Sequence, residues 1–266
     1  MGQEDLQGES MSFWDHLDVL RSSIIRMVVV TVAFALVAFL FKDAVFSVIL
    51  APKYDDFVIY QLFDRINEWL TGTGMQGFSV KLINTGLAQQ FVVHMKVSLY
   101  VGLLFSSPYI LYLLFRFISP ALYADERKYS LQIVSWGYLM FLFGVLLSYF
   151  LIFPLTFRFL GTYQVSEDVT NMITLDSYIG TLMTLNLAMG IVFELPLLCW
   201  LLAKLGILNV DFMKRFRKHA VVVILIAAAI ITPTSDAFTM LVVALPIWLL
   251  YEASIRIVGH TRSVKR

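Results

Sequence analysis

Long apolar runs separated by short polar stretches dominate this chain. Hydrophobic residues make up 59% of its 266 residues and charged residues only 15%, whereas soluble domains carry about 25% charged residues. A helix needs about 20 apolar residues to cross a bilayer. The runs therefore predict an all-α polytopic membrane protein with six transmembrane helices, at about 24–41, 91–118, 129–153, 177–202, 219–232 and 237–252.

The same runs define the domain organisation. A cytoplasmic N-terminal segment with an amphipathic helix occupies 1–22, a six-helix transmembrane domain occupies 23–257, and a cytoplasmic tail occupies 258–266. The last two spans are short. A helix of about 14 residues measures only about 21 Å, while the hydrocarbon core measures about 30 Å. The final hairpin is therefore expected to thin the bilayer or to contact other subunits.

The distribution of basic residues orients the spans. Six spans place both termini on one side of the membrane. Fourteen of the 20 lysines and arginines lie on that side, and five lie in the loops of the other side. Because cytoplasmic loops carry an excess of basic residues, both termini are predicted to be cytoplasmic. The loop between the second and third spans is then cytoplasmic as well.

Two short stretches outside the apolar runs have patterns of their own. Residues 12–20 place Phe13, Leu17 and Leu20 on one helix face, which predicts a short helix on the membrane surface before the first span. Residues 53–88 form the longest polar region. They contain an amphipathic helix over 56–70, a short strand over 78–83 and a turn into the second span, and this pattern favours a packed cap over a binding site.

The loop between the second and third spans is short and charged. Pro120 stops the preceding helix, because it lacks an N–H and disfavours the α conformation at Ser119. Two acids and two bases follow over 125–128. The simplest interpretation is that these charges end two helices at the membrane surface. The alternative is a recognition site, because ion pairs strengthen at the edge of the bilayer, where less water surrounds them.

Glu194 is the most unusual residue of the fourth span. A carboxylate inside a bilayer is unfavourable unless it is neutralised, hydrated or paired, so it is a candidate functional site. Asn186, Gly190 and Glu194 are spaced by four and predict one polar or small stripe facing a wet cavity. The alternative is a protonated glutamate bonded to a neighbouring helix.

The sequence contains none of the common catalytic or metal-binding patterns. It lacks His-Glu-x-x-His, a glycine-rich phosphate loop and Cys/His metal spacing. We therefore expect no cofactor, no metal and no enzymatic activity, and the net charge of +1 gives no argument for nucleic acid. An alternative function is a small-solute or proton-coupled secondary transporter that uses Glu194, although no inverted repeat is evident.

Five short motifs stand out along the chain: Ser119-Pro120-Ala121-Leu122-Tyr123-x-x-Glu126-Arg127, His16-Leu17-Asp18-Val19-Leu20-Arg21, Ala51-Pro52, Phe193-Glu194-Leu195-Pro196 and Thr232-Pro233-Thr234-Ser235-Asp236. Together they resemble TatC, the core subunit of the twin-arginine protein translocase. The charged loop resembles the first cytoplasmic loop of that family, and the resemblance extends over 13–255.

The resemblance implies a receptor for signal peptides that carry consecutive arginines. Glu126 matches the family's key carboxylate, and a carboxylate accepts two parallel hydrogen bonds from a planar guanidinium. Phe117 and Leu122 match apolar positions beside it, where they line the site or pack the helix ends. Arg127 orients Glu126 or contacts a lipid phosphate.

The N-terminal motif departs from the family at one position. Val19 stands where the family has a glutamate implicated in signal-peptide recognition. Asp15, one helical turn earlier, is the preferred substitute, although it also suits a helix cap. Asp18 is adjacent but rotated by about 100°. Arg21 completes the motif.

The resemblance also implies partners and a location. The partners are single-span TatA and TatB subunits, folded cargo with twin-arginine signal peptides, and further copies of this chain in a receptor complex. The location is the bacterial cytoplasmic (inner) membrane, and export depends on the proton-motive force. Five residues match structural or partner-contact positions, with Met240 in place of a frequent glutamine; they are Pro52, Thr232, Pro233, Asp236 and Met240.

Overall fold

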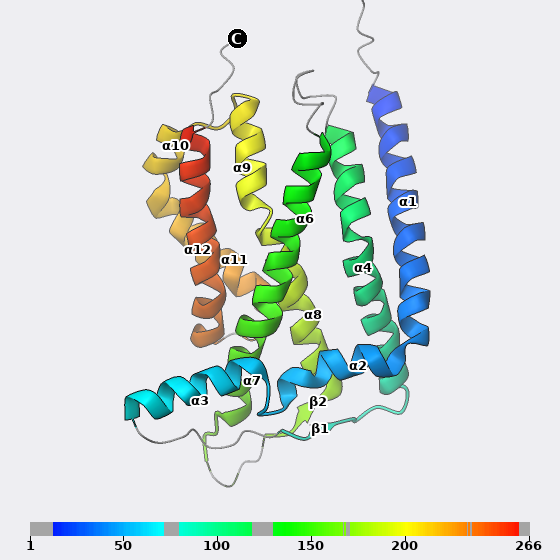
Figure 1. Ribbon diagram of the computed structural model, residues 1–266, viewed down its shortest axis with the longest axis vertical. Helices are drawn as coiled ribbons and strands as arrows, with labels where there is room; N and C mark the ends of the chain where they lie inside the picture. The colour runs from blue at the N-terminus through cyan, green and yellow to red at the C-terminus, as the bar shows by residue number, and fades with distance from the viewer. Residues whose placement is uncertain are drawn as a thin grey trace, which may run out of the picture.

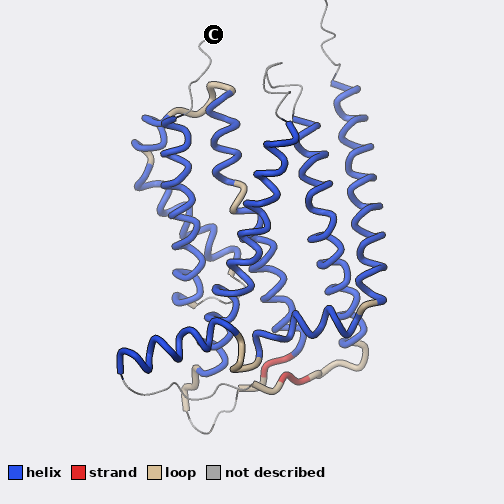
Figure 2. The backbone as a smooth tube through the Cα atoms, in the orientation of Figure 1, coloured by secondary structure: helices blue, strands red, loops and turns tan. Residues whose placement is uncertain are grey.

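The computed structural model describes residues 13–71, 80–118, 130–166, 168, 171–232, 234 and 236–260. Long helices run side by side, and two shorter helices, α2 and α3, cross one end of the bundle (Figures 1 and 2). The elements are α1 Phe13–Leu40, α2 Lys42–Leu50, η1 Ala51–Lys53, α3 Val58–Thr71, β1 Leu82–Ile83, α4 Gln89–Ile118, α6 Ser130–Leu147, η3 Ser148–Ile152, α7 Phe153–Thr162, β2 Ile173–Thr174, α8 Leu175–Val192, α9 Leu195–Lys204, α10 Val210–Arg215, α11 Arg217–Ile231 and α12 Ala237–His260.

The described chain is a polytopic membrane protein, which confirms the predicted fold class. Five helical stretches are long and apolar enough to cross a membrane. The fifth predicted span, 219–232, corresponds to α11, whose 15 residues measure about 22 Å. The N-terminal end of α1 and the C-terminal end of α12 lie together at what we term the inner end, and α2 and α3 lie at the outer end (Figure 1).

Two predicted helix boundaries at the inner end were wrong. No separate surface helix forms over 12–20, because α1 is continuous from Phe13 to Leu40. The residues that follow Leu20 include no proline or glycine, so nothing interrupts the helix. The last helix also extends beyond its predicted end at 252. Glu252 forms an ion pair with Arg217 of α11, and α12 continues to His260.

Two prolines act differently from the prediction. Pro154 does not end the third span. The chain passes through the π-helical turn η3 into α7, where Pro154 lies in the first turn and removes no required N–H donor. Pro196 instead breaks the predicted fourth span into α8 and α9. Its ring would clash with the carbonyl of Val192, four residues earlier, and α8 ends at that residue.

The helices α1 and α4 pack closely along their length. Gly102 makes this possible, since a Cβ atom there would lie only 2.6 Å from the backbone nitrogen of Ala35. Small residues of this kind let membrane helices approach each other. Nearby, the hydroxyls of Thr31 and Ser106 are 2.8 Å apart and join the two helices by a hydrogen bond.

A structured cap closes the outer end, as the pattern of residues 53–88 predicted. The amphipathic helix is α3, and β1 pairs in parallel with β2. Two tyrosines of the bundle help to fix the cap. Tyr149 and Tyr178 donate hydrogen bonds to the carbonyls of Val48 and Ile49, near the end of α2. Both carbonyls lie in the last turn of α2, so these bonds tie the end of that helix to η3 and α8.

Candidate functional site

The predicted recognition loop falls largely outside the described residues. Leu122, Glu126 and Arg127 are not among the described residues. Phe117 is described and lies half-buried in the last turn of α4. The C-terminal end of α4 and the N-terminal end of α6 lie together at the inner end (Figure 1), so the undescribed loop joins two neighbouring helix ends.

The N-terminal motif lies on α1 at the same end of the bundle. Asp18, Val19 and Arg21 are exposed. Asp15 belongs to the first turns of α1, but its side chain is not among those that the structure describes. Asp18 and Arg21 line a shallow surface pocket of about 290 Å³, together with Ser22, Ile25 and Arg26. Because α1 and α4 pack together, this motif and Phe117 share the inner end.

Glu194 lies at the break between α8 and α9. It precedes the first residue of α9 and borders a cavity of about 480 Å³. The cavity lies between four helices, and Glu194 and Ser107 are its polar residues. Its apolar lining consists of Leu103, Ile110, Leu111, Leu114, Phe115, Ile133, Phe141, Leu187, Ile191, Leu197, Leu198 and Leu201.

The carboxyl group of Glu194 is half-buried against α6. Gly137 lies opposite, and a Cβ atom there would come within 3.2 Å of Glu194 Oε2. The other oxygen, Oε1, is buried and has no hydrogen-bond partner among the described residues. The predicted bond from Glu194 to a neighbouring helix is therefore not found within the described part of the chain. The carboxyl group is available to a group that enters the cavity.

Asn186 does not share this cavity, contrary to the prediction of one polar stripe. It is buried, and its side-chain amide donates to the hydroxyl of Tyr100 at 3.1 Å. Gly190 packs against Phe141 and does not border open space. The prediction of one stripe assumed that a single helix continues from Asn186 to Glu194. In the structure α8 ends at Val192, so Glu194 does not lie on its face.

Of the predicted structural or partner-contact residues, the four that are described lie at the outer end. Pro52 is buried in η1, and its carbonyl lies 3.0 Å from the Tyr60 hydroxyl. Thr232 is buried at the end of α11. Met240 packs against the main core and is only partly exposed. Pro233 lies outside the described residues.

Asp236 caps the last helix. Its Oδ1 accepts a hydrogen bond of 2.7 Å from the backbone N–H of Thr239, in the first turn of α12. Burial acts to raise the pKa of this carboxyl group, but the hydrogen bonds from Thr239 and Thr234 outweigh it and hold the pKa below its ordinary value.

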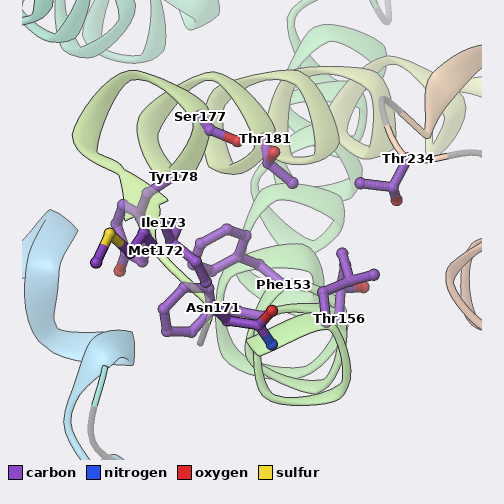
Figure 3. A pocket seen from close by; sticks show the side chains of 11 residues that line it. Phe153, Thr156, Asn171, Met172, Ile173, Ser177, Tyr178, Thr181 and Thr234 are labelled. Atoms are coloured by element: carbon purple, nitrogen blue, oxygen red, sulfur yellow. The ribbon is translucent and has the colours of Figure 1, made fainter. Parts of the chain in front are cut away.

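Sequence reasoning predicted a cavity at Glu194 but missed its apolar walls, which come from α4, α6, α8 and α9. It also missed a second cavity. The second, about 270 Å³, lies at the outer end between α7, α8 and Thr234 (Figure 3). Aromatic rings line it, and the buried hydroxyl of Thr156 has no hydrogen-bond partner among the described residues. No sequence motif marked it.

Comparison with known proteins decides the family. The model of the Sec-independent protein translocase protein TatC matches residues 15–246. The chain belongs to the TatC family. TatC of Blattabacterium sp. subsp. Periplaneta americana is 33% identical over 93% of this chain and 94% of its own length. TatC of Aquifex aeolicus is 31% identical over 92% of this chain and 93% of its own length.

A solved TatC structure supports the same assignment. A chain described as "Crystal Structure of Twin Arginine Translocase Receptor- TatC" is 30% identical, with a TM-score of 0.72, over 92% of this chain and 98% of that one. The predicted TatC resemblance is thus confirmed. The chain is a component of Sec-independent protein transport, and the alternative of a small-solute transporter is not supported.

Proposed function

We propose that this chain is the signal-peptide receptor and assembly core of a twin-arginine translocase in the bacterial cytoplasmic membrane. One observation carries the proposal: the TatC match over 15–246 includes the loop that holds Glu126 and Arg127. The chain receives folded cargo with twin-arginine signal peptides and exports it with the proton-motive force. Nucleic acid has no part in this function.

The recognition chemistry is that of a carboxylate and a guanidinium. Glu126 accepts two parallel hydrogen bonds from a signal-peptide arginine, which a lysine ammonium cannot match in geometry. Phe117 and Leu122 contact the arginine stems and the apolar part of the peptide. On α1, Asp15 or Asp18 supplies the second carboxylate that Val19 lacks, and Arg21 orients it.

The Glu194 cavity receives an inserted helix. Its volume of about 480 Å³ and its apolar lining suit several side chains of the signal peptide's apolar segment or of a partner helix. The unpartnered Oε1 of Glu194 then accepts a hydrogen bond from a polar group of that helix. Such a bond is favourable, because the carboxyl group is otherwise unsatisfied in an apolar environment.

Single-span partners of the TatA and TatB type dock near the outer end of the last hairpin. The helix α11 is shorter than the hydrocarbon core of the bilayer is thick, and this mismatch favours contact with further helices. In this chain Met240 packs inward, so polar contacts with a partner fall to Asp236 rather than to that position. Several copies of the chain assemble in one receptor complex.

Photocrosslinking from the loop tests the receptor assignment. A photoreactive residue at Leu122 leaves Glu126 intact, and the probe is a twin-arginine signal peptide. We expect a crosslink with that peptide and its loss both with a twin-lysine peptide and in the Glu126→Ala variant. Lys128→Ala serves as a matched control in the same loop. Equal crosslinking of both peptides, or crosslinking independent of Glu126, would refute the proposal.

A further inference from the structure

The outer helix α3 exposes an apolar row that no described residue covers. Val58, Leu62, Ile66 and Trp69 are spaced by four, four and three, which places them on one face of the helix. All four are exposed, with Trp69 at 84% and Val58 at 66%. Isolated exposed apolar residues are ordinary, but an aligned row marks a surface that contacts something apolar.

A second, polar row runs beside the first. Gln61, Arg65 and Glu68 are all exposed. At about 100° per residue, the centre of this row lies roughly 90° from the centre of the apolar row. The face that holds Tyr60 is turned toward the bundle and is buried. The helix therefore has three faces: one against protein, one polar and one apolar.

The rotation of α3 is fixed, so the apolar row points in a defined direction. The hydroxyl of Tyr60 lies 3.0 Å from the carbonyls of both Pro52 and Pro154. Arg158 lies over the Tyr60 ring, 5.4 Å from its centroid. These contacts hold α3 across the outer end of the bundle, and its far end extends outside the outline of the long helices (Figure 1).

The surface of α3 joins the membrane-facing surface of the spans. Phe57, directly before α3, stacks on Phe150 with ring centroids 5.8 Å apart and an interplanar angle of 12°. Phe150 belongs to the membrane-spanning stretch Gln132–Thr162 and is 42% exposed. The apolar row of α3 thus begins where the lipid-facing surface of that span ends.

We propose that α3 is an in-plane membrane anchor that embeds Val58, Leu62 and Ile66 among the acyl chains of the outer leaflet. The polar row remains in water, and Trp69 lies at the headgroup level, where indole rings are enriched. The helix contains two acids, Asp64 and Glu68, and one base, Arg65. Its affinity is therefore for acyl chains and does not depend on anionic headgroups.

Nitroxide accessibility in the full-length protein tests this anchor. Cys199 is the only cysteine, so a Cys199→Ala background accepts single labels. Labels at 62 and 66 report the apolar row, and labels at 61 and 65 are matched controls one residue away. In phosphatidylcholine vesicles, we expect labels at 62 and 66 to have a several-fold higher ratio of oxygen to nickel-chelate collisions than the controls. Adding phosphatidylglycerol should leave this ratio unchanged.

Two results would overturn the proposal. Similar, predominantly aqueous accessibility at all four positions would place the whole helix in water. Immobilised labels at 62 and 66 that neither oxygen nor the chelate reaches would show that protein, such as a second copy of the chain, covers the row. Both results are independent of signal-peptide binding, so they leave the receptor assignment unaffected.

Discussion

Glu194 places a carboxyl oxygen that has no partner among the described residues beside an apolar cavity, which is unfavourable for stability. Removing a buried, unsatisfied polar group recovers about 1–3 kcal/mol. We therefore expect Glu194→Leu to raise the thermal unfolding temperature in detergent while it reduces export of a twin-arginine cargo. Normal export by both Glu194→Gln and Glu194→Ala would mean that the cavity does not use this carboxyl group.

Asp236 makes a pH-dependent contribution to stability. Because its pKa is lowered in the folded state, its contribution is fully present above the unfolded pKa of about 3.9 and is lost as the pH falls through the folded value. Asp236→Asn keeps an acceptor for the Thr239 N–H but does not titrate. We expect the stability of the variant to fall less than that of the wild type between about pH 5 and pH 3. Parallel pH profiles would contradict this expectation.

Individual residues of the site were predictable only where they contrast with their surroundings. Glu194 stands out because it is an acid inside an apolar run. Asn186 was grouped with it by spacing, yet it bonds to Tyr100 of another helix. Spacing along one helix cannot reveal such a partner, because the two residues come together only when α4 packs on α8.

The contact between α1 and α4 depends on one missing side chain. A Cβ atom on Gly102 would lie 2.6 Å from Ala35 N and 2.7 Å from Thr31 O, which are backbone atoms that cannot rotate away. We expect Gly102→Ala to separate the helices and to lower the free energy of unfolding by about 1–3 kcal/mol, as in other overpacked cores. Steric trapping or thermal unfolding in detergent measures this loss.

Gly180 provides the matched control for that prediction. It lies within α8, and no atom lies within 4 Å of the position that its Cβ would occupy. Gly180→Ala should leave stability unchanged or raise it by up to about 1 kcal/mol, since alanine favours the helix. If both substitutions had the same effect, the loss at Gly102 would not arise from the α1–α4 contact.

At the level of helices, prolines were the least reliable indicators of where a helix ends. Pro154 and Pro196 both lie in the first turn of a helix. Before Pro154 the chain adapts through a π-helical turn and continues, whereas before Pro196 the helix ends and exposes Glu194 to the cavity. The difference depends on how the neighbouring helices pack, which local sequence does not specify.

The whole molecule combines spans of unequal length. The number of spans and the location of both chain ends at one end of the bundle were predictable, because the bilayer requires apolar runs of defined length and an even number of spans returns the chain to its starting side. The apolar walls of the Glu194 cavity and the three faces of α3 were not predictable, since they arise from contacts between distant segments. The spans differ in length: α1 has 28 residues, whereas α11 has only 15 and measures about 22 Å.

This inequality predicts a local thinning of the bilayer around α11. Leu40 at the outer end of α1 and Ile230 at the outer end of α11 are about equally exposed, at 81% and 78%. If the bilayer thins around α11, nitroxide labels at the two positions should have similar depths in vesicles of the isolated chain. A flat bilayer of about 30 Å would bury the Ile230 label several ångströms deeper than the Leu40 label, because α11 is too short to reach the far surface.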